Sequence, residues 1–151
     1  MARIEIIPAE ASHLEHIAAV LRQADRDEVT ALTGRDVLSV VTESFERSSV
    51  CMVALVDGRP EVIFGAGDLS VLTRLGAPWL LGSDAIKKHR SVFLRLSRHW
   101  LEQLFERYST LRNIVDCRND VAIRWLRWLG FEFSAPFEHR GHRVMMFELR
   151  S

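Results

Sequence analysis

Residues Val50–Val56 form an unbroken apolar run, VCMVALV, and the dipeptide Asp57-Gly58 follows it directly. A strand with one face in water alternates apolar and polar residues, so a continuous run predicts a strand that is covered on both faces. Asp-Gly is a strong two-residue hairpin signal, and residues 61–66 are therefore expected to return antiparallel to the first strand. A chain built around such a hairpin needs covering layers on both sides of its sheet.

Two helices are predicted before this hairpin, behind a short alternating strand. Ser12 and Glu15 form a capping box, which opens a helix with an apolar stripe at helical spacing. Residues 24–28, ADRDE, are too polar to be buried and are expected to form a loop. Thr33 and Asp36 are expected to cap the second helix, which also carries an apolar stripe.

The second half of the chain alternates strands and helices. A strand over residues 77–81 contains Pro78, which cannot donate to a ladder, so this strand is expected to be irregular, bulged or unpaired on that side. The long helix that follows has its apolar stripe at Phe93, Leu96, Trp100 and Leu104. After the next strand, Asn119 is expected to cap a helix that ends at Gly130, and a hairpin finishes the chain.

The complete predicted order is β-α-α-β-β-β-α-β-α-β-β, an α/β arrangement with one mixed, twisted sheet and helices on both faces. With 151 residues and no repeat or linker, the chain is expected to form a single domain over residues 1–151. Trp100, Trp125 and Trp128 stand at core-like helical positions and are assigned to packing.

Composition excludes several partners. Twenty Lys and Arg residues cancel twenty Asp and Glu residues, so neither nucleic acid nor an anionic membrane is expected as a partner. No charged leader and no apolar run of roughly 18 residues is present, which predicts a cytoplasmic protein with no membrane span. Cys51 and Cys117 have neither metal-type spacing nor a disulfide framework, as expected in a reducing compartment.

The segment from Asn119 to Phe131, NDVAIRWLRWLGF, together with the element order, resembles the GNAT N-acetyltransferases. In that family Asn opens the fourth helix, a small residue follows three positions later, and Leu-Gly-Phe leads into the sixth strand. The same residues make physical sense here, because Asn119 caps the helix, Ala122 permits close packing and Gly130 takes a left-handed turn. The resemblance implies a seven-stranded sheet that splays between its fourth and fifth strands to admit acetyl-CoA or another acyl-CoA.

The resemblance also implies where the acyl-CoA would lie. A backbone N–H of the fourth strand would hold the thioester oxyanion, and a basic loop before the third helix would hold the pyrophosphate. The residues expected to bind the cofactor are Leu80, Leu81, Gly82, Lys88, His89, Arg90, Ser91 and Asn119. No metal is expected, since His139 and His142, which border the acceptor site in the family, lack a carboxylate partner. These two histidines are expected to act as proton relays at most.

Two positions depart from the family pattern. Ser91 and Phe93 stand where the phosphate loop of the family has its two glycines, so Phe93 obstructs close backbone approach unless it points into the core. Leu126 stands where many members have a tyrosine that protonates the departing thiolate. Glu28 is the candidate catalytic base near the acceptor cleft, and its alternative is a residue of a solvated loop. The basic run at residues 87–90 likewise either holds phosphates by charge or forms a solvated helix start.

Two functions therefore remain open. The first is an acyl-CoA-dependent N-acyltransferase with an unknown amine acceptor and weakened or lost activity. The second follows from a closer resemblance to GNAT-like proteins of tailed phages, including the internal virion protein A family of short-tailed phages. The residues that carry it are Phe64-Gly65 and the stretches 78–82, 93–98 and 115–119. It implies a non-catalytic structural or assembly protein with a phage or host protein as its partner, located in the host cytoplasm or the virion.

Overall fold

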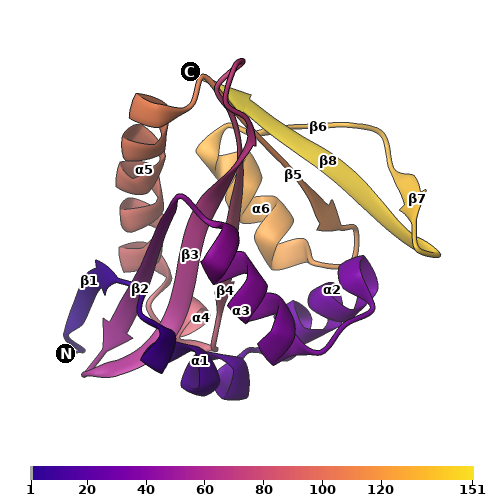
Figure 1. Ribbon diagram of the computed structural model, residues 1–151. Coiled ribbons are helices and arrows are strands. Elements are labelled where there is room, and N and C mark those ends of the chain that lie inside the picture. Colours follow the sequence, from indigo (N-terminus) through magenta and orange to yellow (C-terminus); the bar gives the residue numbers. More distant parts are fainter. Residues whose placement is uncertain (1) are drawn as a thin grey trace.

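The computed structural model describes residues 2–151 and shows one mixed sheet with helices on both faces (Figure 1). Its strands are β1 (Ile4–Pro8), β2 (Val50–Val56), β3 (Arg59–Ser70), β4 (Leu75–Gly82), β5 (Thr110–Asp116), β6 (Glu132–Phe133), β7 (Phe137–His139) and β8 (His142–Arg150). Its helices are the 3₁₀ turn η1 (Ala11–His13), α1 (Leu14–Val20), α2 (Gln23–Thr33), α3 (Val37–Arg47), α4 (Ala85–Lys88), α5 (Arg90–Arg107) and α6 (Asp120–Leu129). None of these helices in residues 2–151 is both long and apolar enough to cross a bilayer.

The strand order is β1-β2-β3-β4-β5-β8-β6, and β7 also pairs with β8. Only the β4–β5 pair is parallel among the strand pairs of residues 2–151. The sheet has eight strands rather than seven because the outer partner of β8 is interrupted between Phe133 and Phe137. Pro136 lies in this interruption, where its missing N–H breaks no ladder bond.

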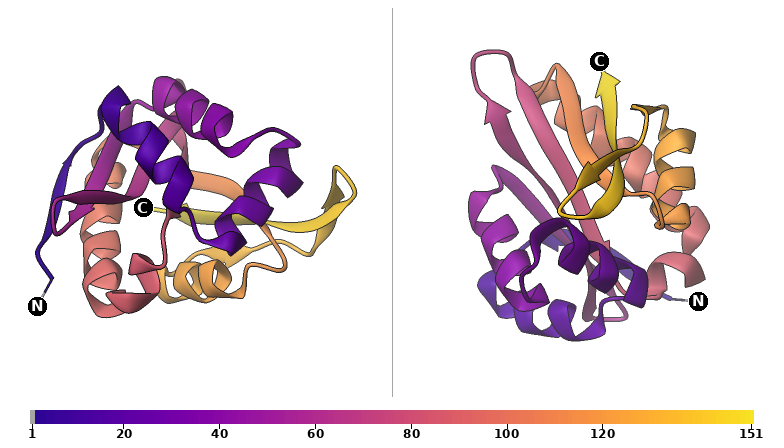
Figure 2. Two further views of the ribbon diagram at one scale, coloured as in Figure 1. Left: turned by 90° about the horizontal axis from the view of Figure 1, so that it is seen from below. Right: turned by 90° about the vertical axis from the view of Figure 1, so that its right-hand side faces the viewer.

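The hairpin of β2 and β3 confirms the reading of the apolar run. Val53 and Ile63 pack toward α1 and α3, whereas Ala54 and Val62 pack toward α4 and α5 on the opposite face. The two views of Figure 2 show these two helical layers on either side of the sheet. Asp57 and Gly58 form the turn with φ values of 50° and 81°, the left-handed conformation that this hairpin type requires.

Helix α2 corrects the prediction of a loop at residues 24–28. The helix spans Gln23–Thr33 and ends at Gly34, whose φ of 67° is left-handed. The prediction was wrong because it treated charge as incompatible with burial. Asp25 is only 2% exposed, and it is buried because a charged partner and a backbone N–H satisfy its carboxylate.

The helix ends confirm some capping predictions and correct one. The first helical segment starts at Glu10, whose N–H donates to Nδ1 of His13 at 3.0 Å, so the capping box predicted at Ser12 and Glu15 is wrong. Asp36 caps α3 by accepting from the Ser39 N–H, as predicted. Thr33 instead lies at the end of α2, where its hydroxyl donates to a carbonyl of the same helix.

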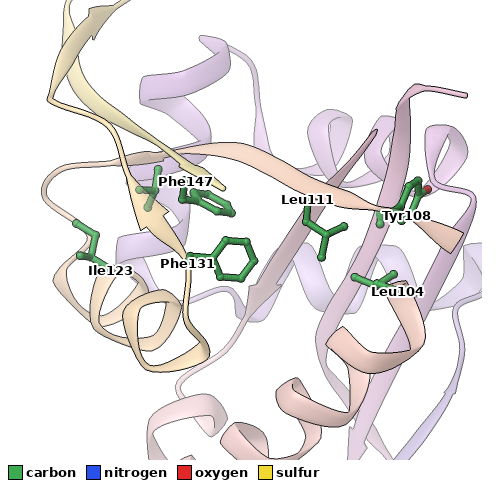
Figure 3. Packing of buried hydrophobic residues seen from close by; sticks show 8 residues of the cluster. Leu104, Tyr108, Leu111, Ile123, Phe131 and Phe147 are labelled. Atoms are coloured by element: carbon green, nitrogen blue, oxygen red, sulfur yellow. The ribbon is translucent and has the colours of Figure 1, made fainter. Parts of the chain in front are cut away.

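Most of the second half of the chain folds as its sequence predicts, and β7 is an additional strand. Asn119 caps α6 by accepting from the Ala122 N–H at 3.3 Å, and Gly130 ends the helix with a φ of 102°. The buried side chains between α5, α6 and the β5–β8 pair form a separate cluster, shown in Figure 3. Its labelled members are Leu104, Tyr108, Leu111, Ile123, Phe131 and Phe147.

Strands β4 and β5 touch at one end and part at the other. Their ladder is limited to two partner pairs, Leu75 with Thr110 and Gly76 with Leu111. Beyond it, the Asn113 side chain spans the gap by donating to the Pro78 carbonyl at 3.0 Å. Figure 1 shows the two strands diverging toward their carboxyl ends, which confirms the predicted splay between the fourth and fifth strands.

Candidate functional site

The divergence of β4 and β5 opens a cavity of about 350 Å³. This volume lies within the range of roughly 300–1,000 Å³ that small-molecule sites occupy. Its walls come from both helical layers as well as from the two strands, because the gap passes through the sheet. The cavity therefore connects the face covered by α2 and α3 with the face covered by α5 and α6.

Arg22, Asp25 and Glu28 form a polar stripe that closes the mouth of this cavity. They are three residues apart, so they share one side of α2. The Arg22 N–H donates to the Gly82 carbonyl at 3.0 Å, and the Gly82 N–H donates to Oδ2 of Asp25 at 2.9 Å. Helix α2 thus supplies the hydrogen bonds that the end of β4 lacks where β5 has moved away.

Glu28 supplies hydrogen bonds to the end of β5 in the same way. Its Oε1 accepts from the Asp116 N–H and its Oε2 accepts from Nδ2 of Asn119, both at 2.8 Å. Burial raises the pKa of Glu28, and these two hydrogen bonds offset part of that rise. The structure places the predicted base in the cavity wall on helix α2, and Asn119 beside it.

The guanidinium of Arg22 is enclosed at the same place. Its side chain is 6% exposed, and Nη2 donates to Oδ1 of Asp25 at 2.9 Å and approaches Oδ1 of Asn119 at 3.5 Å. Within residues 2–151, Nε and Nη1 are buried and have no hydrogen-bond partner. Most buried donors in proteins are paired, so these two groups are exceptions within residues 2–151.

Leu80 is the residue of β4 whose backbone is turned toward the cavity with no partner among residues 2–151. Backbone groups of alternate residues point to the same edge of a strand, and Pro78 and Gly82 point toward β5. The Pro78 carbonyl is occupied by Asn113, and both backbone groups of Gly82 are occupied by α2. Among Leu80, Leu81 and Gly82, Leu80 therefore has the backbone edge that faces the cavity without a bond to a neighbouring element of residues 2–151.

The region predicted as a phosphate loop is largely helical. Helix α4 holds the N–H groups of Lys88 and His89, which donate to the Asp84 and Ala85 carbonyls at 3.1 Å and 2.9 Å. Phe93 is 4% exposed and packs on the sheet, so it points into the core and obstructs nothing outside. Arg90 and Ser91 begin α5, where the first N–H groups of a helix have no intrahelical partner.

A groove of about 410 Å³ lies between the start of α5 and helix α6. Lys87, Arg90 and Arg124 supply its charge, and Trp125 and Trp128 supply its aromatic surface. Trp128 is 47% exposed, with the Arg98 guanidinium 4.2 Å from its ring centroid, so its assignment to the core is wrong. The guanidinium makes a cation–π contact with the indole ring, and this contact stabilises the ring at the surface.

Other predicted residues lie apart from the mouth of the cavity. Leu126, which stands where the resemblance predicts a tyrosine, lines the cavity wall with an apolar side chain. The single tyrosine, Tyr108, donates to Asp68 at the opposite end of the β4–β5 pair. His139 bonds the Leu32 carbonyl at 3.0 Å, which ties the β7–β8 hairpin to the end of α2.

Arg22 is a site residue that sequence reasoning missed, and the burial of Asp25 was not expected either. The signal was present, because a three-residue spacing from Arg22 through Asp25 to Glu28 places all three on one helix face. Gly34, four residues after Thr30, was a further sign of a helix end. A run of charges was taken as solvated because the sequence does not show the unpaired strand ends that these side chains bind.

No protein-family model and no curated protein matches the sequence. Solved structures do match. A ribosomal-protein-alanine N-acetyltransferase from Brucella melitensis superposes with a TM-score of 0.76 and 14% identity, covering 97% of this chain and 99% of that one. An N-acetyltransferase from Staphylococcus aureus Mu50 superposes with a TM-score of 0.74 and 14% identity, covering 98% of each chain. An acetyltransferase of the GNAT family from Streptococcus pneumoniae superposes with a TM-score of 0.67 and 14% identity, covering 98% of this chain and 99% of that one.

These identities are low, but the structures superpose over nearly the whole of both chains. The chain therefore has the GNAT fold, as its element order and its α6 segment predicted. The likeness to phage proteins has no counterpart in these three structures and stays a prediction. Fold alone leaves the chemistry open, because one architecture can serve many functions.

Proposed function

We propose that the protein is an acyl-CoA-dependent N-acyltransferase. The observation that carries this proposal is that the basic groove adjoins the cavity, whose lining includes Leu80. Ile86, Val121 and Trp125 line both the groove and the cavity, so these three residues form a shared wall. A long ligand with an anionic head and a thioester end fits two adjoining sites of this kind.

The basic groove supports binding of the nucleotide part of CoA. Lys87, Arg90 and Arg124 provide positive charge, and the N-terminus of the 18-residue helix α5 adds N–H donors and the favourable end of a helix dipole. The indole ring of Trp128 lines the groove and offers apolar surface to the adenine base beside the Arg98 guanidinium, which covers one face of the ring. Phe93 anchors the start of α5 to the core, where the family has a glycine-rich loop. The positive charge and the helix N-terminus would take over the role of that loop.

The mouth of the cavity supports the chemistry. The Leu80 N–H is placed to stabilise the oxyanion as an acceptor amine attacks the thioester carbonyl. Glu28, whose pKa burial raises, can take the proton that the amine nitrogen releases. The C–S bond then breaks and the thiolate takes its proton from water, since Leu126 cannot donate one.

A second candidate function is a non-catalytic module that binds a phage or host protein. It is favoured by the α2 stripe, which closes the mouth of the cavity on the acceptor side, and by the apolar Leu126. Binding of CoA separates the two functions before any acceptor is known. The enzyme requires binding, whereas the module does not.

The test is calorimetric titration of CoA at low and high salt. Binding is expected to be salt-sensitive, because surface charges hold the phosphates. The Arg90→Gln variant is expected to weaken binding severalfold, whereas Arg95→Gln, an exposed change on α5 outside the groove, leaves it unchanged. Absence of binding at millimolar CoA contradicts the enzyme and favours the module.

If CoA binds, release of free thiol in the presence of a panel of primary amines tests transfer itself. Glu28→Gln keeps the shape of the side chain and one of its two accepted hydrogen bonds, and it removes the base, so turnover is expected to fall while CoA affinity holds. A variant that turns over normally would remove Glu28 from the mechanism.

A further inference from the structure

The cavity at the β4–β5 gap has two parts of different chemistry. Its mouth is polar and contains Arg22, Asp25, Glu28 and Asn119. Its inner part, which we call the deep chamber, extends under β5 on the side of α5 and α6. The deep chamber is lined by Trp100, Leu101, Leu126, Leu129, Phe131 and Phe147.

The deep chamber lies inside the apolar core rather than at its edge. Phe131 and Phe147 are each 6% exposed and meet edge to face at 5.2 Å between ring centroids, so they form a rigid end wall, visible in Figure 3. Leu101, Leu126 and Leu129 pack against the same cluster yet stay only partly buried. All three leucines also line the cavity, so they form the side walls of the deep chamber.

The polar side chains nearest the deep chamber are already paired. Oγ of Ser97 donates to the Phe93 carbonyl at 2.7 Å and accepts from Nε1 of Trp125 at 3.1 Å. Asn113 donates to Pro78 through Nδ2 and accepts the Ile114 N–H through Oδ1 at 2.8 Å. Both side chains are engaged within the fold, so a polar ligand group would have to share these hydrogen bonds or displace them.

This division of polarity determines what each part can hold. The amides of a pantetheine arm need hydrogen-bond partners, which the backbone of Leu80 and the side chain of Asn119 at the mouth can offer. An amine placed in the deep chamber would lose its hydration without compensation, so the acceptor belongs at the Glu28 end. Only a hydrocarbon group enters the deep chamber without leaving a polar atom unpaired.

We propose that the acyl donor carries a hydrocarbon chain longer than acetyl, and that this chain lies in the deep chamber. The proposal rests on the proposed acyl-CoA function and specifies its donor. An acetyl group bound at Leu80 would leave the deep chamber empty, since an apolar cavity without polar partners stays dry. A longer chain fills it and buries apolar surface on both sides.

The test is a calorimetric series with CoA, acetyl-CoA, hexanoyl-CoA and octanoyl-CoA on the full chain. Affinity is expected to rise from acetyl to hexanoyl by up to about fourfold for each buried methylene, which corresponds to ~0.8 kcal/mol. Equal affinities for acetyl-CoA and the longer donors overturn the proposal while the acyl-CoA function stands. Failure of every CoA species to bind overturns both, so the two failures are distinguishable.

Leu101→Phe narrows the deep chamber without touching its mouth. The variant is expected to lose the preference for octanoyl-CoA over acetyl-CoA by about tenfold or more, because two or more methylenes are excluded, and to keep its affinity for CoA. If thermal unfolding shows that it does not fold, Leu129→Phe narrows the same space from α6. Leu38→Phe, the same change at an exposed position of α3, is the matched control. Retention of the octanoyl preference in a folded chamber variant overturns the proposal.

Discussion

The backbone groups of β4 and β5 are hydrogen-bonded in different ways at the two ends of the strand pair. At the closed end the strands bond to each other, and the ring of Tyr108 lies so close to Gly76 that a Cβ there would meet it at 2.6 Å. The Tyr108 hydroxyl donates to Asp68 at 2.6 Å, which fixes the ring in place. At the open end the strands do not meet, and side chains of α2 bond to both.

The difference shows how a sheet can stay open without leaving its backbone unsatisfied. Ladder bonds at the closed end exclude any ligand, whereas the Arg22–Asp25–Glu28 stripe satisfies Gly82 and Asp116 and leaves Leu80 between them. The stability of the open end thus depends on buried charge, and the stability of the closed end depends on close packing. Each end should respond to its own kind of substitution.

The largest effect is expected from Asp25→Ala at the open end. The change removes the partner of a guanidinium that is 6% exposed, and breaking a buried ion pair costs about 3–5 kcal/mol. Urea unfolding measures this loss. Asp27→Ala on the exposed side of α2 is the matched control, for which a change within about 0.5 kcal/mol is expected. A similarly small loss for Asp25→Ala would show that the stripe does not support the open end.

Gly76→Ala should disrupt the closed end by overpacking. The new Cβ would press on the face of the Tyr108 ring, which has no room to retreat at 2% exposure, and such overpacking costs roughly 1–3 kcal/mol. Gly67→Ala is the control, because its Cβ would have ordinary contact at 3.4 Å. Equal thermal stability of the two variants would remove the role given to close packing.

Asn119→Ala is expected to cost roughly 1 kcal/mol through its lost helix cap, and somewhat more because Glu28 loses a donor. Asn119→Ser separates the two contributions, since a serine oxygen can still cap α6 but cannot reach Glu28. The expected order of melting temperatures is wild type, then Ser, then Ala. Unchanged unfolding in both variants would contradict both the helix cap and the role of the Asn119–Glu28 hydrogen bond.

The smallest effect concerns acid at the closed end. The Arg107 guanidinium, with help from the Tyr108 hydroxyl, lowers the pKa of Asp68 from 3.8 to about 2. A lowered pKa stabilises the fold above the ordinary value, and this contribution is lost as the pH falls from 3.8 toward 2. The melting temperature of the wild type should therefore fall more steeply over this window than that of Asp68→Asn. Parallel curves would show that Asp68 does not contribute to the pH dependence of stability. The Asp84→Asn variant, at an exposed position, serves as the control.

Sequence patterns predicted the sheet on both sides of the gap, but not the packing of its closed end. The apolar run at Val50–Val56, the Asn119 cap and the Pro78 irregularity are local signals, and each produced the expected element. The burial of Asp25 was not predictable in this way, because its partners at Arg22 and Gly82 depend on a tertiary gap between two strands. Trp128 failed for a related reason, since Arg98 of another helix holds it at the surface.

The central claim is that Leu80 is the unpaired donor of an acyl-CoA site at the open end. Amide hydrogen exchange followed by NMR tests it residue by residue. In the free protein the Leu80 N–H is expected to exchange quickly, while those of Gly82 and Asp116 are protected by α2. Saturating acyl-CoA should then protect Leu80 and leave the other two unchanged. A Leu80 amide that is already protected in the free protein, or that still exchanges quickly with acyl-CoA bound, would contradict the account.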